Sequence, residues 1–378
     1  MKMPVTESRV PSRVVIIDNG TGFTKNGFGG EQVPRTIIPT VVKRKVSNVR
    51  NNTDFRSRYY IGKEAISREG ITDLIYPIEH CIIRNWDAMI SIWDYTFYDD
   101  IKIDPKQYSI LLIRSPDIPT KNRRKIAEIM FEIFNVPAIY LGIDAVLALF
   151  ALERTTGLVV SSGEGATYIV PIREGFVISH AVKKINLSGI DITQMITEFM
   201  AQRGFHFKAY GGISVARHIK ESLCYVALDY EKELSCYSKE PEKIKKEYIM
   251  PDSNILELGK ERFLIPEVLF NPSLANIKEM PLHEAIIDVI NQCDFDIRGD
   301  LYNNIILNGG STMFRGFKER LHKELRELTS NRFSVRILAI SNRHLTAWIG
   351  GSLLVSLKNL QKLWITSEKY RKEGPDAL

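Results

Sequence analysis

The chain alternates short apolar runs with longer segments in which apolar residues recur at helical spacing. Four consecutive β-branched residues at 14–17 predict a buried strand, since a half-exposed strand would alternate apolar and polar residues. Further apolar runs predict strands at 108–113, 138–142, 157–162, 166–171 and 305–308. Helical spacing predicts helices at 86–93, 122–134, 144–152, 215–228 and 316–328, while 188–193 open another helix and 250–252 begin a hairpin. This alternation predicts the α/β class.

Glycine turns follow three of the predicted strands, at 18–22, 161–165 and 308–312. A Gly-x-Gly turn lets backbone N–H groups approach an anion closely. In the first turn, the Thr21 hydroxyl and the Lys25 ammonium would donate to phosphate oxygens, and Asp18 would face the accompanying metal ion. Two strand–glycine–strand hairpins therefore predict a duplicated fold that clamps the phosphates of a nucleotide, with the third turn under its base or sugar. Three unrelated hairpin turns are the structural alternative.

Length and composition limit the class of protein. A chain of 378 residues with 44% hydrophobic and 25% charged residues fits two large globular domains. No apolar run reaches the length of a membrane span, and the first residues carry no hydrophobic signal core, which predicts an intracellular protein. Four cysteines (Cys81, Cys224, Cys236 and Cys293) lack metal spacing and are expected to remain thiols.

The formal net charge of +6 does not by itself indicate nucleic-acid binding. It is concentrated between residues 43 and 58, where six basic residues face a single acid, Asp54. This basic segment predicts a solvated loop; a docking surface for an acidic partner is the alternative.

Several motifs together resemble actin and the actin-related proteins over essentially the full length. They include 18–22 (DNGTG), 76–80 (YPIEH), 154–157 (RTTG), 309–313 (GGSTM) and 348–352 (WIGGS). The resemblance implies a duplicated, ribonuclease-H-like α/β fold with two lobes and four subdomains. It also implies ATP or ADP with Mg or Ca in the central cleft. The expected subdomains are 1–39, 77–151 and 346–378 for the first, 40–76 for the second, 152–187 and 279–345 for the third, and 188–278 for the fourth.

The resemblance assigns most of the nucleotide site to the glycine turns and to one helix. The residues that it assigns to the nucleotide are Gly20, Thr21, Gly22, Lys25, Gly163, Glu164, Gly165, Arg217, Lys220, Glu221, Gly309, Gly310, Thr312, Met313 and Phe314. Asp18 would hold the cation through water. Without the resemblance, Lys220 and Glu221 would be interpreted as a surface pair on a helix.

The chain departs from actin where hydrolysis is promoted. Asp144 stands where actin has a glutamine that orients water, and Ser161 replaces an aspartate in the second turn. Glu164 replaces that turn's other aspartate, and Tyr168 replaces a histidine. Each such change typically costs about 1.4–4 kcal/mol of transition-state stabilisation, so we expect weak or absent ATPase activity. Alternatively, Asp144 acts as a replacement base and Glu164 restores metal coordination.

The base site and the assembly surfaces also differ from actin. His344 replaces a lysine and Ser214 a glutamate, and the loop 46–53 is basic and polar where actin carries small apolar residues. An apolar groove near Phe150, Thr155, Leu353 and Leu354 is expected to bind helices of actin-binding proteins.

We therefore expect a cytoskeletal protein of the cytoplasm. It would assemble with itself or with other actin-family subunits, in a filament or a multi-subunit complex, without contacting nucleic acid directly. A dynamically polymerising ATPase and a scaffold subunit in the nucleus are the alternatives.

Overall fold

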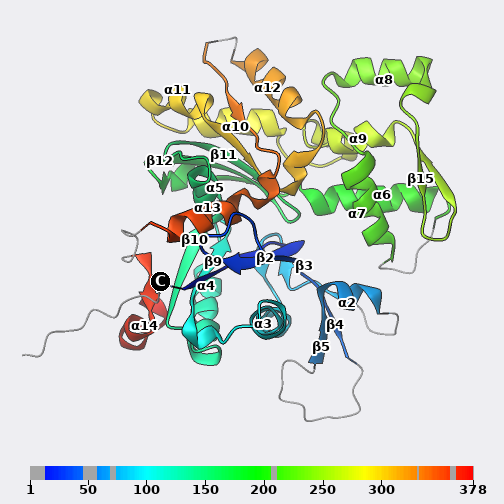
Figure 1. The fold of residues 1–378 in the computed structure, drawn as a ribbon. Coiled ribbons are helices and arrows are strands. Elements are labelled where there is room, and N and C mark those ends of the chain that lie inside the picture. The colour runs from blue at the N-terminus through cyan, green and yellow to red at the C-terminus, as the bar shows by residue number, and fades with distance from the viewer. Residues whose placement is uncertain are drawn as a thin grey trace, which may run out of the picture. The chain divides into compact units, whose positions relative to one another are not determined.

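The computed structural model describes residues 13–45, 58–68, 74–205, 211–329, 332–357 and 363–377 (Figure 1). The chain divides into two compact units. Unit 1 comprises Met1–Arg154 and Leu345–Leu378, and unit 2 comprises Thr155–His344. Each unit is built around its own mixed β-sheet. The finer division of the chain into four subdomains stays a prediction.

The sheet of unit 1 has the strand order β19-β10-β9-β1-β2-β3. Its strands are β1 (Val14–Asn19), β2 (Phe23–Phe28), β3 (Thr36–Pro39), β9 (Ser109–Arg114), β10 (Ala138–Ile143) and β19 (Ile365–Thr366). β1 pairs antiparallel with β2 across the first glycine turn and parallel with β9 on its other side. Val15, Ile16 and Ile17 are buried and confirm the buried strand that the β-branched run predicts, although Val14 is partly exposed.

Helices cover this sheet and follow most of the predicted spans. They are α3 (Trp86–Tyr95), α4 (Thr120–Glu128), α5 (Asp144–Phe150), α13 (Thr346–Val355) and α14 (Ser367–Glu373), with π-turns η1 (Thr96–Asp100) and η3 (Ile129–Ile133) and 3-10 turns η2 (Pro105–Gln107) and η10 (Gly374–Ala377). The Asn85 side chain caps α3 by accepting a hydrogen bond from the Ala88 amide at 3.1 Å. The helix predicted at 122–134 consists of α4, which begins at Thr120, and of the short π-helix η3 that continues it.

A small three-stranded sheet completes unit 1 together with a short hairpin. The elements are β4 (Val42–Arg44), β5 (Tyr59–Ile61), β6 (Leu74–Ile75), α2 (Gly62–Ser67), β7 (Ile78–Glu79) and β8 (Ile82–Ile83). Lys43, expected in a solvated loop, is only 7% exposed, because it lies in β4 and its ammonium donates to the Arg68 carbonyl at 2.6 Å. Most of the basic segment, 46–57, lies outside the described residues.

One glycine, Gly350, lets α13 pack against its neighbour α5 in unit 1. A Cβ atom at Gly350 would lie 1.7 Å from the Leu147 carbonyl oxygen of α5, so only glycine permits this helix crossing. At Gly351 the nearest atoms would lie at 3.5 Å, an ordinary contact. The adjacent Trp348 is fully buried, and its indole N–H donates to the Ile16 carbonyl at 3.4 Å.

The sheet of unit 2 has the order β13-β12-β11-β17-β18, and β14 pairs with β12. Its strands are β11 (Gly157–Ser162), β12 (Thr167–Arg173), β13 (Phe176–Val177), β14 (Lys183–Ile185), β17 (Ile305–Asn308) and β18 (Ile337–Leu338). As in unit 1, an antiparallel hairpin encloses a glycine turn, and its first strand pairs in parallel with a later strand. Shared topology supports the predicted duplication.

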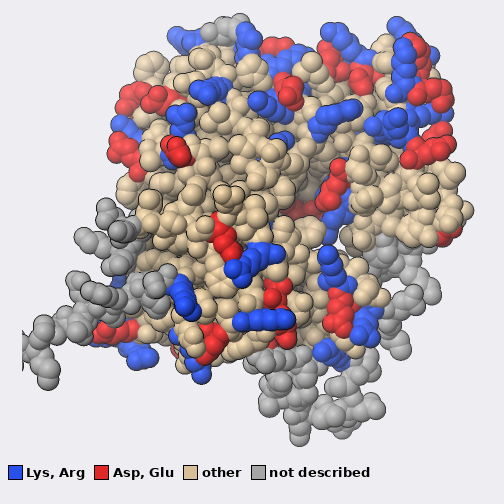
Figure 2. All heavy atoms as spheres, viewed as in Figure 1, with Lys and Arg blue, Asp and Glu red and all other residues tan. Residues whose placement is uncertain are grey.

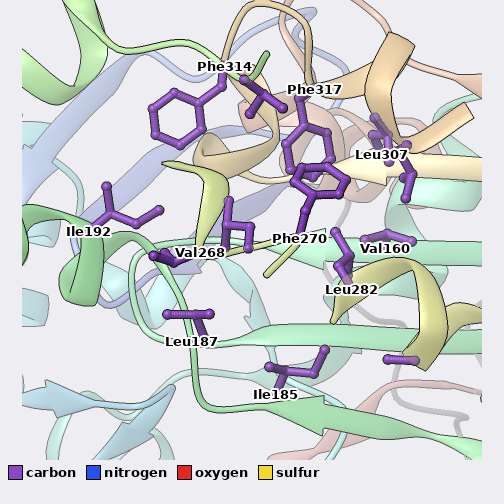
Figure 3. Packing of buried hydrophobic residues seen from close by; sticks show 14 of the residues in the cluster. Val160, Ile185, Leu187, Ile192, Val268, Phe270, Leu282, Leu307, Phe314 and Phe317 are labelled. Carbon is purple, nitrogen blue, oxygen red and sulfur yellow. The ribbon is translucent and has the colours of Figure 1, made fainter. Parts of the chain in front are cut away.

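The helices of unit 2 bury one large apolar cluster against this sheet. They are α6 (Gly189–Gln202), α7 (Gly211–Leu223), α8 (Tyr230–Lys239), α9 (Glu261–Glu267), α10 (Leu282–Asn291), α11 (Phe295–Asn303) and α12 (Phe317–Leu328), with 3-10 turns η4 (Ser179–Ala181), η5 (Pro241–Lys243), η6 (Pro272–Ala275) and η7 (Gly310–Met313). The turn η8 (Arg343–Leu345) leads back to unit 1. Figure 3 shows part of the cluster, in which Phe270 and Phe317 pack beside Val160 and Leu307.

Two predictions for unit 2 are wrong in their boundaries. The helix expected at 215–228 ends at Leu223, because the amides of Tyr225 and Val226 donate to the carbonyls of Arg262 and Arg315 instead. Residues 250–252 do not begin a hairpin but form its turn, between β15 (Lys246–Ile249) and β16 (Ile255–Leu258).

The viewed surface carries charges of both signs around a broad region of other residues (Figure 2). Figure 2 shows lysine and arginine residues interspersed with aspartate and glutamate over the viewed face. None of the four cysteines, all of which the structure describes, forms a disulfide bond. Among the described residues, no helix is long and apolar enough to span a bilayer.

Candidate functional site

The first glycine turn is built from unit 1 alone. The Gly20 amide donates to the Phe23 carbonyl at 3.1 Å, and a Cβ atom at Gly20 would lie 2.6 Å from the same oxygen. Thr40 braces the turn, donating from its hydroxyl to the Gly20 carbonyl at 2.8 Å and from its amide to Gly22 at 3.0 Å. Within the described part of the chain, the amides of Thr21 and Gly22 donate to no protein group. This turn can therefore offer N–H groups to an anion.

Lys25 and Asp18 lie opposite each other in the β1–β2 register. The Lys25 ammonium donates to the Asp18 carboxylate at 2.5 Å. An ammonium carries three N–H donors, and this is the one protein acceptor that Lys25 has among the described residues. Two donors of Lys25 therefore remain for phosphate oxygens, while Asp18 stays close enough to the turn to hold a hydrated cation.

A short turn between β7 and β8 supports Thr21. The Cys81 amide donates to the Thr21 hydroxyl at 3.3 Å, and the thiol of Cys81 lies 3.9 Å from that oxygen. His80 and Cys81 both have positive φ angles, 46° and 68°. Non-glycine residues in this region cost roughly 1 kcal/mol each. No local sequence pattern predicts this contact, because it joins residues 60 positions apart.

Asp144 follows β10, at the same sheet edge as the first turn, because β1, β9 and β10 run parallel. Arg114, at the end of β9, was not identified from the sequence. Its guanidinium donates to the carbonyls of Ser115 and Pro116 at 2.9 and 3.2 Å. Burial lowers the pKa of Arg114, and Arg123 lowers it further, whereas Asp144 opposes both effects. The added negative charge of Asp144 is therefore partly offset by a neighbouring guanidinium.

The second glycine turn, in unit 2, rests on the N-terminus of α6. The Gly163 carbonyl accepts hydrogen bonds from the Gly189 amide at 2.9 Å and the Ser311 hydroxyl at 2.7 Å. The Glu164 carbonyl accepts from the Ser188 hydroxyl at 2.8 Å and the Ile190 amide at 2.9 Å. Both carbonyls thus face α6, which leaves the amide of Glu164 without an acceptor among the described residues.

Open space lies beside the second and third turns. A Cβ atom at Gly163 or at Gly310 would meet no other group within 4 Å. The amides of Gly310 and Ser311, at the start of η7, donate to no group in the described ranges. Donors beside unfilled space match the requirements of phosphate or sugar oxygens. The residues present therefore fit a nucleotide on this face of unit 2.

Glu164 joins the second turn to α7. Its carboxylate accepts from Arg217 at 2.8 Å and from Lys220 at 3.1 Å, one cation on each oxygen. Burial would raise the pKa of Glu164, but Lys220 and Arg217 outweigh burial and hold the pKa below its ordinary value. Glu221, the next residue on α7, is exposed.

Ser161 and Tyr168 face each other across the β11–β12 hairpin, as their places beside the turn require. Asn308, the last residue of β17, donates to the Ser161 hydroxyl at 2.9 Å. Tyr168 is buried, and the Lys184 ammonium lies 5.4 Å from the centre of its ring. The Ser161 hydroxyl and the Asn308 amide thus form a neutral pair that joins β11 and β17 near their ends.

The third turn has structural and accessible members. Gly309 has a φ of 93°, and a Cβ atom there would lie 2.3 Å from the Ser162 carbonyl oxygen. Thr312 and Phe314 are buried, and the Thr312 hydroxyl donates to the Gly309 carbonyl at 2.7 Å. Met313 is 37% exposed, so only Gly310 and Met313 of this turn are open to a ligand.

The structure therefore brings the predicted residues together in two separate sets. Unit 1 holds Asp18, Gly20, Thr21, Gly22, Lys25 and Asp144; unit 2 holds Ser161, Gly163, Glu164, Gly165, Tyr168, Arg217, Lys220, Glu221, Gly309, Gly310, Thr312, Met313 and Phe314. The described residues contain no cluster of three or more His, Cys, Asp or Glu side chains that could bind a metal ion directly.

The predicted partner groove needs a correction. Leu354 is only 5% exposed, because it packs in the core with Ile16 and Trp348. Leu353 is 48% exposed and Phe150 is half-buried, so these two remain surface residues of unit 1. Thr155 belongs to unit 2.

The sequence model of one known family, described as actin, matches residues 10–378. The match includes every residue that the structure describes. The mixed sheets and helices of the two units agree with the actin-like α/β fold that the motifs predict.

Proposed function

Because the chain belongs to the actin family, whose members generally bind a nucleotide with a divalent cation, we propose that it binds ATP or ADP through its glycine turns. One observation carries the proposal: both hairpins present backbone N–H groups that have no acceptor among the described residues. Lys25 and Asp18 stand beside the first turn, and open space adjoins the second and third. A bound polyphosphate would satisfy these donors and stabilise the folded chain.

The division of labour follows from the side chains. The amides of Thr21 and Gly22 and two N–H donors of Lys25 would bind phosphate oxygens. Asp18 would orient the water shell of Mg or Ca, which supplies charge neutralisation when bound. Glu221, Gly310 and Met313 would face the nucleoside, since they are the accessible members of the predicted set.

We further propose that hydrolysis is weak or absent. Ser161 replaces a carboxylate and is already paired with Asn308. Asp144 places negative charge at the sheet edge that carries the first phosphate turn, where a water-orienting amide is expected. Both changes weaken the positioning of an attacking water and of the cation's water shell. The chain would then use its nucleotide as a structural ligand.

The chain is a cytoskeletal-type protein by family. We propose that it assembles in the cytoplasm, as a filament with itself or as a fixed subunit among other actin-family proteins. Leu353 and Phe150 would contribute to a surface for actin-binding proteins. A nuclear scaffold subunit is the alternative for the same fold.

The primary test identifies the bound nucleotide. Purified protein is denatured, and the released nucleotide is separated by chromatography before and after prolonged incubation. We expect about one ATP or ADP per chain. Gly310→Ala, which fills the open space, should reduce occupancy at least tenfold. Gly299→Ala in α11, where a Cβ also meets no atom within 4 Å, is the matched control and should keep full occupancy. An empty wild-type protein that also fails to bind added Mg-ATP contradicts the proposal.

A second test concerns hydrolysis. Restoring the family residues in the double variant Asp144→Gln, Ser161→Asp should raise phosphate release by roughly tenfold or more over wild type. Rapid release from the wild-type protein, with a lag that follows filament formation, would instead support the dynamically polymerising ATPase.

A further inference from the structure

Lys220 is saturated by acceptors within unit 2. Its ammonium donates to the Gly189 carbonyl at 2.8 Å, the Thr193 hydroxyl at 2.8 Å and the Glu164 carboxylate at 3.1 Å. An ammonium has three N–H donors, and all three are used. The side chain is also buried, with 5% of the residue exposed. Lys220 therefore has no donor left for a nucleotide.

The acceptors of Lys220 lie in the second turn and on α6. Glu164 is in the turn, while Gly189 and Thr193 belong to the first turns of α6. The same α6 terminus holds the Gly163 and Glu164 carbonyls, as described above. Lys220 thus fixes the Glu164 side chain to the helix that already fixes the Glu164 backbone. Arg217, one helical turn earlier, holds the other carboxylate oxygen.

Gly189 lies beside the Lys220–Glu164 contact, where little room is left for a side chain. A Cβ atom at Gly189 would lie 2.7 Å from the second carboxylate oxygen of Glu164 and 2.9 Å from the Ser311 hydroxyl. The second turn, α6 and η7 therefore come close together at Gly189, where a side chain would displace the Glu164 carboxylate or the Ser311 hydroxyl. A displaced Glu164 would carry with it the turn whose Glu164 amide has no acceptor among the described residues.

We propose that Lys220 is a positioning residue, which holds the second turn in its binding shape through Glu164 and donates no hydrogen bond of its own to the nucleotide. This inference rests on the proposed nucleotide function, and it changes the role that the family resemblance assigns to Lys220. Glu164 has the same positioning role, because each of its carboxylate oxygens binds a cationic side chain of α7. The nucleoside side of the site is then left to Glu221, Gly310 and Met313.

A double-mutant cycle of Lys220→Met and Glu164→Gln tests the proposal by isothermal titration with Mg-ATP and Mg-ADP. Each single change should weaken binding roughly tenfold to a hundredfold, since charge-assisted hydrogen bonds are lost. Because Lys220 acts through Glu164, Lys220→Met should add less than about threefold in the Glu164→Gln background. A full, additive loss in that background means that Lys220 does not act through Glu164 and overturns the proposal.

Thr193→Val provides a milder variant that keeps the ammonium and removes one of its acceptors. A positioning role predicts nucleotide binding a few-fold weaker, because Lys220 then holds Glu164 and the second turn less firmly on α6. A direct-contact role predicts unchanged or tighter binding, because a donor of Lys220 is released, and that result overturns the proposal.

Thermal unfolding separates this inference from the proposed function. If wild type binds neither nucleotide, the proposed function fails, and the cycle is evaluated from melting temperatures alone. Non-additive losses of melting temperature for Lys220→Met and Glu164→Gln then support the proposed action of Lys220 through Glu164, and additive losses overturn it.

Discussion

The two glycine turns share a sequence pattern but differ in how they are supported. In unit 1 the cation of the turn is local, since Lys25 lies seven residues from Asp18 on the paired strand and keeps two donors unused. In unit 2 the cations come from α7, 53 and 56 residues after Glu164, and Lys220 keeps none. A lysine beside a phosphate turn can therefore serve the ligand or the protein. The number of its protein acceptors distinguishes the two roles.

The largest effect on stability is expected from replacing each of the two lysines by methionine. Lys220→Met breaks a buried pair and should lower the free energy of unfolding by about 3–5 kcal/mol. Lys25→Met breaks a single pair whose side chains are 15% and 13% exposed, so it should cost less, about 1.5–3 kcal/mol, and also lower Mg-ATP affinity. Chemical denaturation and titration of both variants measure the contrast. Equal stability losses would remove the distinction between the turns.

A smaller effect is expected from the glycines that shape the turns. Gly309→Ala should cost about 2–4 kcal/mol, because its Cβ would lie 2.3 Å from a backbone oxygen and its φ is positive. Gly310→Ala, one residue away in open space, should change stability by less than about 0.5 kcal/mol. Denaturation curves of the two variants give the comparison. A stable Gly309→Ala protein would show that the turn can rearrange.

Acid should loosen the second turn through Glu164. Burial opposes ionisation, but Lys220 and Arg217 hold the pKa of Glu164 below its ordinary value of 4.5. A depressed folded-state pKa adds stability that is fully present above pH 4.5 and is lost as the pH falls through the folded-state pKa. Melting temperature should therefore decline below pH 4.5 more steeply in wild type than in Glu164→Gln. Parallel curves would contradict the assignment.

The smallest effect concerns the cap of α6, which supports the second turn. The Asp191 carboxylate accepts from the Ser188 amide at 2.8 Å in a capping box. Asp191→Asn should cost about 0.5–1 kcal/mol and weaken nucleotide binding slightly. Asp87→Asn, in the first turn of α3 in unit 1, is the control and should leave binding unchanged.

What could be predicted from the sequence was local. The run 14–17 and the following glycines predict β1, its turn and β2, and a seven-residue separation on a hairpin places Lys25 opposite Asp18. Helix α12 follows its amphipathic pattern within one residue of the predicted span.

What could not be predicted depends on remote chain segments. Glu164 meets Lys220 only after α6 and α7 are packed, and Arg114 meets Asp144 only through the parallel strands β9 and β10. Helical spacing continued past Leu223, but competing acceptors on Arg262 and Arg315 ended α7 there. The sequence does not distinguish Leu354 from its exposed neighbour Leu353. Leu354 is buried because it packs against Ile16, which lies on a strand more than 300 residues earlier.

The crossing of α13 over α5 at Gly350 also determines when unit 1 can mature during synthesis. Strands β1, β9 and β10 leave the ribosome within the first 143 residues, whereas α13, which covers Ile16 and Leu111, begins at Thr346. At roughly 5–20 residues per second, this delay amounts to about ten to forty seconds. The continuous unit 2 can fold in that interval, while an uncovered apolar sheet face persists in the nascent chain. Chains released before α13 is made should therefore aggregate through unit 1.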